Sequence, residues 1–141
     1  MQMRSLRSIV AGRPPVTVTQ GSTVVEAARR MRERTVGSVL VVDGQRLVGI
    51  FTERDALFRV LAAARDPATT TLGEVMTPQP QTMHPDEPFL RALRVMHEGK
   101  FRHLPVVEFG RPLGIVSVRD ALDDDLTELR WDLEQREEAR E

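Results

Sequence analysis

The feature that most constrains the fold is an internal repeat. Shifting the sequence by 65 residues aligns residues 13–57 with residues 78–122 without a gap, and fifteen of the 45 aligned positions are identical. A repeat of this strength indicates two copies of one structural unit. A chain of 141 residues has room for two small units that share a core, but not for two large independent domains.

Each copy is predicted to contain a short strand, a helix, a two-stranded hairpin and a second helix. In the first copy, valines alternate with threonines over residues 16–19, and Thr23 to Glu26 has the spacing of a capping box at a helix start. Gly37 is predicted to end this helix. Asp43-Gly44 is typical of a hairpin turn. The second helix is expected from Thr52 to about Ala64.

The second copy repeats this plan, and a short helix is predicted ahead of the first copy. In the second copy we expect a strand around Thr82, a helix over residues 87–98, strands around 104–107 and 113–116, and a helix from Ser117.

These patterns divide the chain into five segments. Residues 1–12 form a helical lead-in, 13–64 the first repeat, 65–77 a linker that leads into the second repeat, 78–122 the second repeat, and 123–141 an acidic helical tail. A small sheet with two helices leaves an apolar face uncovered, so each copy is expected to complete its core against the other.

Composition narrows the classes of protein that fit. Residues 123–141 hold nine acidic residues and three arginines, while the rest of the chain holds seventeen basic and twelve acidic residues. This balance of charge does not resemble that of a nucleic-acid binder, which usually carries a concentrated basic face. The absence of cysteine excludes a disulfide framework and a thiolate metal site. No apolar run is long enough to cross a bilayer, and the first residues lack the apolar run of a signal peptide. We therefore expect a cytoplasmic protein with no membrane partner.

One seven-residue pattern occurs once in each copy, at residues 49–55 and 114–120. It reads glycine, apolar, any, Ser/Thr, any, any, Asp, and we call these two stretches the signature segments. Glycine permits a close approach at the strand end, and the hydroxyl residue starts a helix whose free amides attract anions. The aspartate could accept hydrogen bonds from both hydroxyls of a ribose, at about 1.5–3 kcal/mol each. The same spacing is also a plain helix capping box, and the two roles can coexist.

The signature segments resemble the nucleotide-binding signature of CBS domains, and the order of elements around them is similar. Val75 to Pro78, at the start of the second copy, and Arg102 to Val107, inside it, strengthen the resemblance, which covers about residues 8–123. It implies an α/β (α+β) fold of two pseudo-symmetric CBS repeats, each a small β-sheet flanked by two helices, packed face to face. An adenosine-containing nucleotide is then expected in the cleft between them.

The resemblance also implies residue roles. Ribose contacts fall to Thr52, Asp55, Ser117 and Asp120, and phosphate contacts to Arg54, Arg119, Arg102 and His103. The base pocket, not assigned to one cleft or the other, draws on Val16, Thr17, Gly37, Ser38, Ile50, Thr82, Met83, Arg102, His103, Leu104, Pro105 and Ile115. Because Pro105 aligns with Leu40 and His103 with Ser38, the two pockets are predicted to be non-equivalent.

The sequence thus predicts a non-catalytic regulatory module that senses AMP, ADP, ATP or NAD, forms a homodimer and signals to a separate effector protein. S-adenosylmethionine fits the many arginines less well. An enzyme is disfavoured, because His84, His97 and His103 form no metal-binding motif and no phosphate-binding loop is visible; no metal is predicted. The alternative is a structural dimerisation or docking module that binds no ligand.

Overall fold

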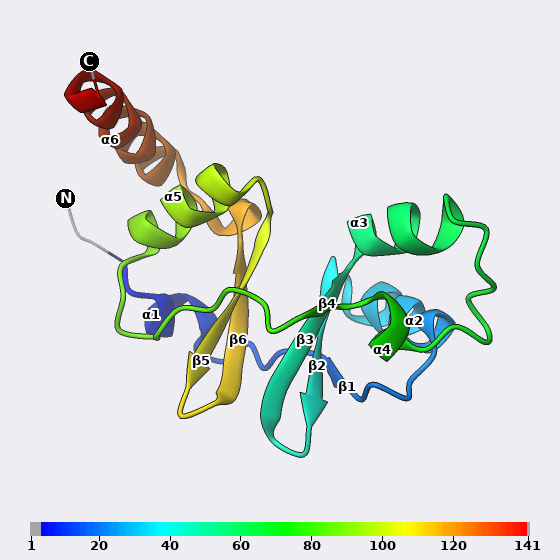
Figure 1. The fold of residues 1–141 in the computed structure, drawn as a ribbon. Coiled ribbons are helices and arrows are strands. Elements are labelled where there is room, and N and C mark those ends of the chain that lie inside the picture. Colours follow the sequence, from blue (N-terminus) through cyan, green and yellow to red (C-terminus); the bar gives the residue numbers. More distant parts are fainter. Residues whose placement is uncertain (1–3, 141) are drawn as a thin grey trace.

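The computed structural model describes residues 4–140 and contains two halves side by side (Figure 1). The first half contains β1 (Thr17–Val18), α2 (Val24–Arg34), β2 (Ser38–Asp43), β3 (Arg46–Thr52), α3 (Glu53–Asp55), a π-helical segment (Ala56–Leu61), α4 (Leu72–Val75) and β4 (Thr77–Pro78). The second half contains α5 (Phe89–Gly99), β5 (His103–Glu108), β6 (Arg111–Ser117) and a 3-10 turn (Val118–Asp120). Helix α1 (Leu6–Val10) precedes both halves, and α6 (Asp123–Arg140) follows them. The predicted α/β fold is confirmed.

The sheet of the first half has the strand order β1-β2-β3-β4. Strand β1 pairs parallel to β2, and β2 and β3 form the predicted antiparallel hairpin. Asp43 still pairs with Arg46, so the turn consists of Gly44 and Gln45, one residue later than predicted. Gly44 has a φ of 63°, a conformation that glycine adopts without steric cost.

The hairpin of the second half has the same register as that of the first. Ser38 pairs with Thr52, and His103 with Ser117. The predicted strand around Thr82 is wrong: only Met83 bridges the sheet, by two backbone hydrogen bonds of 3.1 and 3.0 Å with Pro105 and Val107. Prolines at positions 78, 80 and 85 flank this segment and lack the N–H that a longer ladder needs.

The ends of several helices differ from the prediction. Helix α2 begins at the predicted capping box, but Thr35, with a φ of 53°, ends it instead of Gly37. The helix expected after Ser117 is a single 3-10 turn, because Ala121 adopts an extended backbone with a ψ of 132°. Chain direction changes there, and α6 starts at Asp123, in a run of aspartates that suits a helix N-terminus.

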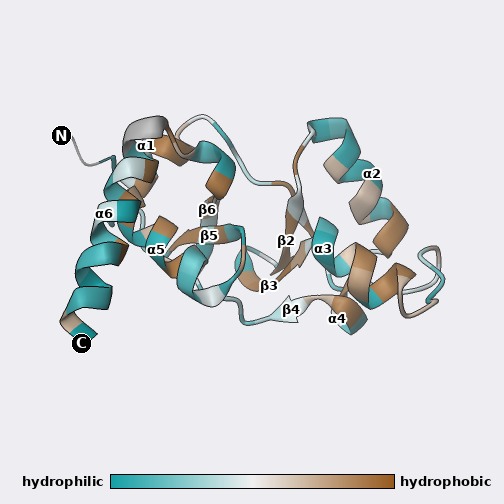
Figure 2. Ribbon diagram, turned by 90° about the horizontal axis from the view of Figure 1, so that it is seen from above, coloured by the Kyte–Doolittle hydropathy of each residue, from teal (hydrophilic) through white to brown (hydrophobic). Residues whose placement is uncertain are grey.

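Two separate hydrophobic cores stabilise the halves. The first comprises Val16, Val18, Val24, Ala27, Met31, Val39, Val41, Phe51, Val60, Leu72 and Val75. The second comprises Leu6, Ile9, Val10, Met83, Phe89, Ala92, Leu93, Met96, Leu104, Val106 and Val116. The expectation that each copy completes its core against the other is therefore wrong, because α4 closes the first core and α1 closes the second. Figure 2 shows that α6 is largely hydrophilic, whereas the central strand β2 is largely hydrophobic.

Helix α1 precedes the first repeat in sequence but packs on β5 and β6 of the second half. The chain therefore crosses between the halves twice, along residues 11–16 and again along residues 76–82, which we call the crossing segments. The halves also meet where β3 contacts β6 and where the N–H of Leu47 donates to the carbonyl of Gly110 at 3.0 Å. Within the described residues, no helix is both long enough and apolar enough to cross a membrane.

Candidate functional site

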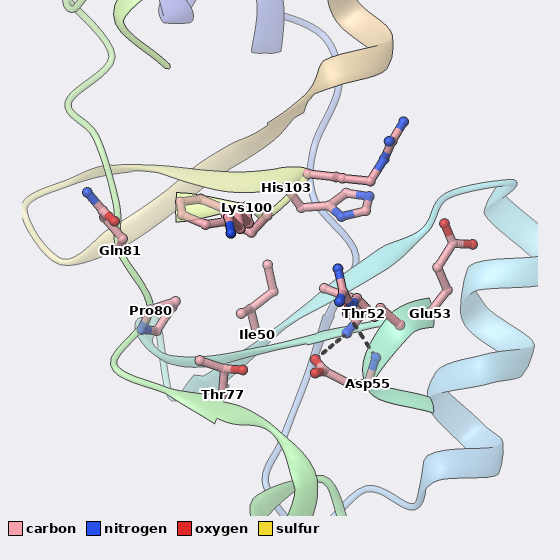
Figure 3. A pocket seen from close by; sticks show the side chains of 12 residues that line it. Ile50, Thr52, Glu53, Asp55, Thr77, Pro80, Gln81, Lys100 and His103 are labelled. Atoms are coloured by element: carbon pink, nitrogen blue, oxygen red, sulfur yellow. Dashed lines mark hydrogen bonds between the residues drawn. The ribbon is translucent and has the colours of Figure 1, made fainter. Parts of the chain in front are cut away.

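One cavity between the halves lies beside the first signature segment, and another lies beside the second. The first pocket has a volume of about 340 Å³ and is lined by Ile50, Thr52, Glu53, Arg54, Asp55, Thr77, Pro80, Gln81, Lys100, Phe101, Arg102 and His103 (Figure 3). The second pocket has a volume of about 420 Å³ and is lined by Gly12, Arg13, Pro14, Pro15, Val16, Arg34, Thr35, Val36, Gly37, Ser38, His103, Ile115, Ser117, Arg119 and Asp120.

The repeat relates the two pockets. Each pocket is lined on one side by the signature segment of one repeat. Its other side is formed by a crossing segment and by the start of the hairpin of the other repeat. A shift of 65 residues carries the lining residues 12–16 of the second pocket onto residues 77–81, and 34–38 onto 99–103. The structure thereby assigns most of the predicted residues to one pocket or the other.

Most predicted site residues line a pocket. The first pocket includes Ile50, Thr52, Arg54, Asp55, Arg102 and His103, and the second includes Val16, Gly37, Ser38, His103, Ile115, Ser117, Arg119 and Asp120. Thr17 and Thr82 line neither and are exposed, while Met83, Leu104 and Pro105 are buried. Successive strand residues face opposite sides of a sheet, so the residue after His103 points into the core.

Of the crossing-segment residues that line the pockets, the sequence reasoning identified only Val16. Arg13, Pro14 and Pro15 line the second pocket, and Thr77, Pro80 and Gln81 line the first. Lys100 and Phe101 of the first pocket and Arg34, Thr35 and Val36 of the second were also missed. The repeat could have identified these residues, because the lining residues of one pocket align with those of the other under the 65-residue shift.

In the first pocket, Asp55 caps the helix that follows β3. Its Oδ2 accepts from the backbone N–H of Thr52 at 3.0 Å, and its own N–H donates to Thr52 Oγ1 at 3.1 Å, as Figure 3 shows. The capping interpretation is therefore confirmed. Asp55 Oδ1 lies 3.5 Å from Nε of Arg59, which does not line the pocket and whose Nη1 donates to the carbonyls of Val75 and Met76.

In the second pocket, both oxygens of Asp120 are occupied. Oδ2 accepts from the N–H of Ser117 at 2.8 Å, and Arg13 donates to Oδ1 at 2.7 Å and to Oδ2 at 3.2 Å. The hydrogen bonds that Arg13 donates to this carboxylate raise the pKa of Arg13 above its usual range. Under the repeat, Arg13 corresponds to Pro78, which has no side-chain donor. The two aspartates thus share a backbone setting but differ in side-chain partners.

His103 lies between the two pockets and lines both. Burial lowers the pKa of His103, and the nearby Arg102 and Arg119 lower it further, while Glu53 and Asp120 partly oppose this shift. The imidazole is therefore held in its neutral form near pH 7. Its counterpart in the first repeat, Ser38, is buried and does not titrate.

The glycines of the signature segments make room for the protein's own side chains. A Cβ at Gly114 would lie 2.6 Å from Val10 Cβ, and a Cβ at Gly49 would lie 2.4 Å from the sulfur of Met76. The close approach predicted at these glycines is thus explained by the residues that lead into each crossing segment.

A third polar cluster joins α1 to the second half outside the pockets. Candidate ligand atoms of His84, Asp86 and Glu108 all lie within 4.8 Å of one another. Arg7 donates to Asp86 at 3.1 Å and to Glu108 at 3.0 Å, so a guanidinium already balances these carboxylates. The cluster is best explained as an ion-pair network that holds α1 in place.

Comparison with known proteins gives a consistent result. Residues 6–62 and 72–126 each match the family model of the CBS domain. The CBS domain-containing protein CBSCBSPB2 of Arabidopsis thaliana is 38% identical over 121 residues, which cover 85% of this chain and 23% of that protein. The chain thus spans less than a quarter of the length of this relative.

Two solved structures resemble the fold closely. The CBS domain protein PAE2072 from Pyrobaculum aerophilum, complexed with AMP, has a TM-score of 0.80 at 26% identity, covering 90% of this chain and 98% of that one. The CBS domain pair of protein MJ0100, in complex with 5-methylthioadenosine and S-adenosyl-L-methionine, has a TM-score of 0.75 at 29% identity, covering 84% of this chain and 93% of that one.

Proposed function

Because the chain belongs to the CBS-domain family and carries two such domains in tandem, we propose that it is a non-catalytic regulatory module that binds an adenosine-containing nucleotide in the first pocket. The observation that carries the proposal is the position of Asp55 at the wall of a cavity of about 340 Å³. No arginine that lines this pocket is paired with Oδ1 of Asp55. A cavity of this size lies within the range of small-molecule sites.

The lining residues suggest how a nucleotide would lie. Asp55 would accept hydrogen bonds from the ribose hydroxyls while still capping its helix through Oδ2. Ile50, Pro80 and Phe101 offer apolar surface for the base. The cations among the lining residues are Arg54, Lys100 and Arg102, and these would attract phosphate groups. This excess of cations favours AMP, ADP, ATP or NAD over S-adenosylmethionine.

The related structures support the ligand class without naming the ligand of this chain. PAE2072 was solved with AMP, and MJ0100 with 5-methylthioadenosine and S-adenosyl-L-methionine. All three molecules contain adenosine, so a ribose and an adenine are the shared elements. The phosphate or other group attached to them is what this chain's own cations would select.

Signalling would require a change in geometry and a receiver. We propose that the ligand favours one relative arrangement of the halves, which it can do only if it binds two arrangements with different affinity. A homodimer is supported by exposed apolar side chains after β3, where Leu57, Phe58 and Leu61 are 50%, 56% and 72% exposed. An effector protein and a cytoplasmic location stay predictions.

The test is a calorimetric titration of AMP, ADP, ATP, NAD and S-adenosylmethionine into wild type and Asp55→Asn. Asparagine can still accept the hydrogen bond from Thr52 but lacks the charge, so we expect binding to weaken by about tenfold or more with the fold intact. Asp43→Asn, at the exposed end of β2 outside both pockets, is the matched control and should bind as wild type does. A wild type that binds none of these ligands would overturn the proposal and favour the docking module.

A further inference from the structure

We infer that Arg13 closes the second pocket to nucleotide, so that the chain binds one nucleotide, in the first pocket, even though both signature segments are intact. The inference rests on the proposed function. The second pocket is no smaller than the first, at about 420 Å³ against about 340 Å³, so size does not exclude a ligand. What distinguishes the second pocket is the guanidinium of Arg13 on its aspartate.

Arg13 makes three hydrogen bonds at the place where a ribose would lie. It donates to both carboxylate oxygens of Asp120, at 2.7 and 3.2 Å, and to the carbonyl of Ile115 at 3.1 Å. The Asp120 side chain is 14% exposed, as is that of Asp55, so the two aspartates differ in their partners and not in exposure. Bidentate pairing of an arginine with a carboxylate is among the stronger ionic contacts in proteins, and partial burial reduces its screening by solvent.

A ribose would need the same two oxygens. Oδ2 of Asp120 already accepts from Ser117 and Arg13, and Oδ1 accepts the shortest of the Arg13 bonds. A diol could therefore bind only by displacing the guanidinium, and part of its binding energy would be spent on breaking that pair.

The equivalent arrangement in the first pocket lacks this obstacle. Pro78 stands at the position of Arg13 and has no donor to offer. Arg59 approaches Asp55 from outside the pocket, with 3.5 Å between Nε and Oδ1, and is tethered by backbone carbonyls of the α4 region. The Asp120 carboxylate is therefore paired with a guanidinium that lines its pocket, whereas the Asp55 carboxylate is paired with Arg59, which does not line the first pocket.

The backbone around Arg13 holds it in this position. Its N–H donates to the carbonyl of Val10 at 3.0 Å, and Val10 packs into the space over Gly114 in the second half. Pro14 and Pro15 follow, and their fixed φ angles stiffen the crossing segment. The pair is therefore preorganised by α1, which lies on the same half as Asp120.

The experiment counts nucleotides bound per chain by calorimetry, with AMP and, in parallel, NAD as probes. Wild type should bind one, and Arg13→Gln should bind two, because glutamine removes the charge and the fork that cover Asp120. Adding Asp120→Asn to Arg13→Gln should return the count to one, in the first pocket. Adding Asp55→Asn to Arg13→Gln should leave one strong site, in the second pocket.

Two further variants control for a general loss of charge and for a failure of Arg13→Gln to fold. Arg30→Gln, on an exposed position of α2 that lines neither pocket, has the same loss of charge and should still bind one nucleotide. Arg13→Lys keeps the charge but cannot bridge both oxygens, so its second site should be weaker than that of Arg13→Gln, and it serves if the glutamine variant fails to fold.

The outcomes separate this inference from the proposed function. Two sites in wild type, or one site in a folded Arg13→Gln, would overturn the inference while leaving nucleotide binding established. Weaker binding in Arg13→Gln would show that Arg13 contacts the ligand instead of covering Asp120. No binding by any variant would overturn both proposals.

Discussion

The two repeats have the same hairpin register and the same signature segment, yet they form different sites. Ser38 pairs with Thr52 and His103 with Ser117, so the backbones present their aspartates in equivalent positions. The difference comes from the crossing segments. One crossing segment places Arg13 on Asp120, whereas the other has Pro78 at the equivalent position. A repeated motif therefore defines where a site can form, and its non-repeated neighbours decide what the site can bind.

The repeats also differ in the structure that comes after their signature segments. In the first half the chain continues as a helical segment to Leu61, packed through Val60 on its own core. In the second half, an extended Ala121 breaks the chain after one 3-10 turn, and α6 leaves along α5. Equivalent sequence positions thus lead to a compact helix in one half and to a projecting tail in the other (Figure 1).

The largest difference in stability between the halves is expected at the signature glycines. In Gly114→Ala the new Cβ would meet Val10 Cβ at 2.6 Å, which cannot move without shifting α1, and overpacking of this kind costs about 1–3 kcal/mol. In Gly49→Ala the sulfur of Met76 can rotate away, so the loss should be smaller. Urea unfolding measures both, and the shared effect of replacing glycine on the unfolded chain cancels in the comparison. Equal losses would show that the two glycines have the same packing role.

A smaller effect is expected at the starts of α2 and α5. Thr23 caps α2 by accepting from the N–H of Glu26, whereas Pro88 makes no side-chain cap and the N–H of Phe89 donates instead to the carbonyl of Arg4. Thr23→Ala should lower the free energy of unfolding by about 1 kcal/mol. Thermal and urea unfolding provide the measurement, with the exposed Thr69→Ala as control. If both variants unfold alike, the cap contributes nothing to stability.

The smallest predicted effect is the pH response of His103, which has Ser38 as its counterpart. Its pKa lies below the ordinary value of 6.5 because the folded state buries the imidazole and places it near Arg102 and Arg119, while Glu53 and Asp120 partly oppose this shift. Below pH 6.5 the unfolded chain therefore binds a proton that the folded state resists, and stability falls until the pH reaches the folded-state pKa. Above pH 6.5 this contribution is absent.

NMR titration of the imidazole signals tests this directly. The His103 resonance should titrate at lower pH than that expected for a free histidine, and His103→Ser should remove part of the stability lost between neutral and mildly acidic pH. His84 and His97 remain in both proteins, so the signal that disappears in His103→Ser identifies the His103 resonance. A normal pKa for His103 would show that the region between the pockets is more hydrated than its geometry indicates.

Local sequence patterns predicted much of this structure. The hairpins, the capping box at Thr23 and the short helix α1 depend on contacts between residues near one another in the chain. The 65-residue repeat further indicated two related pockets. Prolines near Thr82 limit strand pairing and were given too little weight, so the strand there was predicted wrongly. The helix after Ser117 was predicted too long, because the extended backbone of Ala121 ends it after one turn.

By itself, the sequence determined that the chain has two copies of one α/β unit and where the signature aspartates stand. Only the tertiary structure decided that α1 packs on the second half, that α4 closes the first core and that Arg13 covers Asp120. Arg13 and Asp120 are separated by 107 positions, and their contact depends on how the chain crosses between the halves. The physical reason is that repeats and caps are local in sequence, whereas the partner of a buried carboxylate is set by the path of distant backbone.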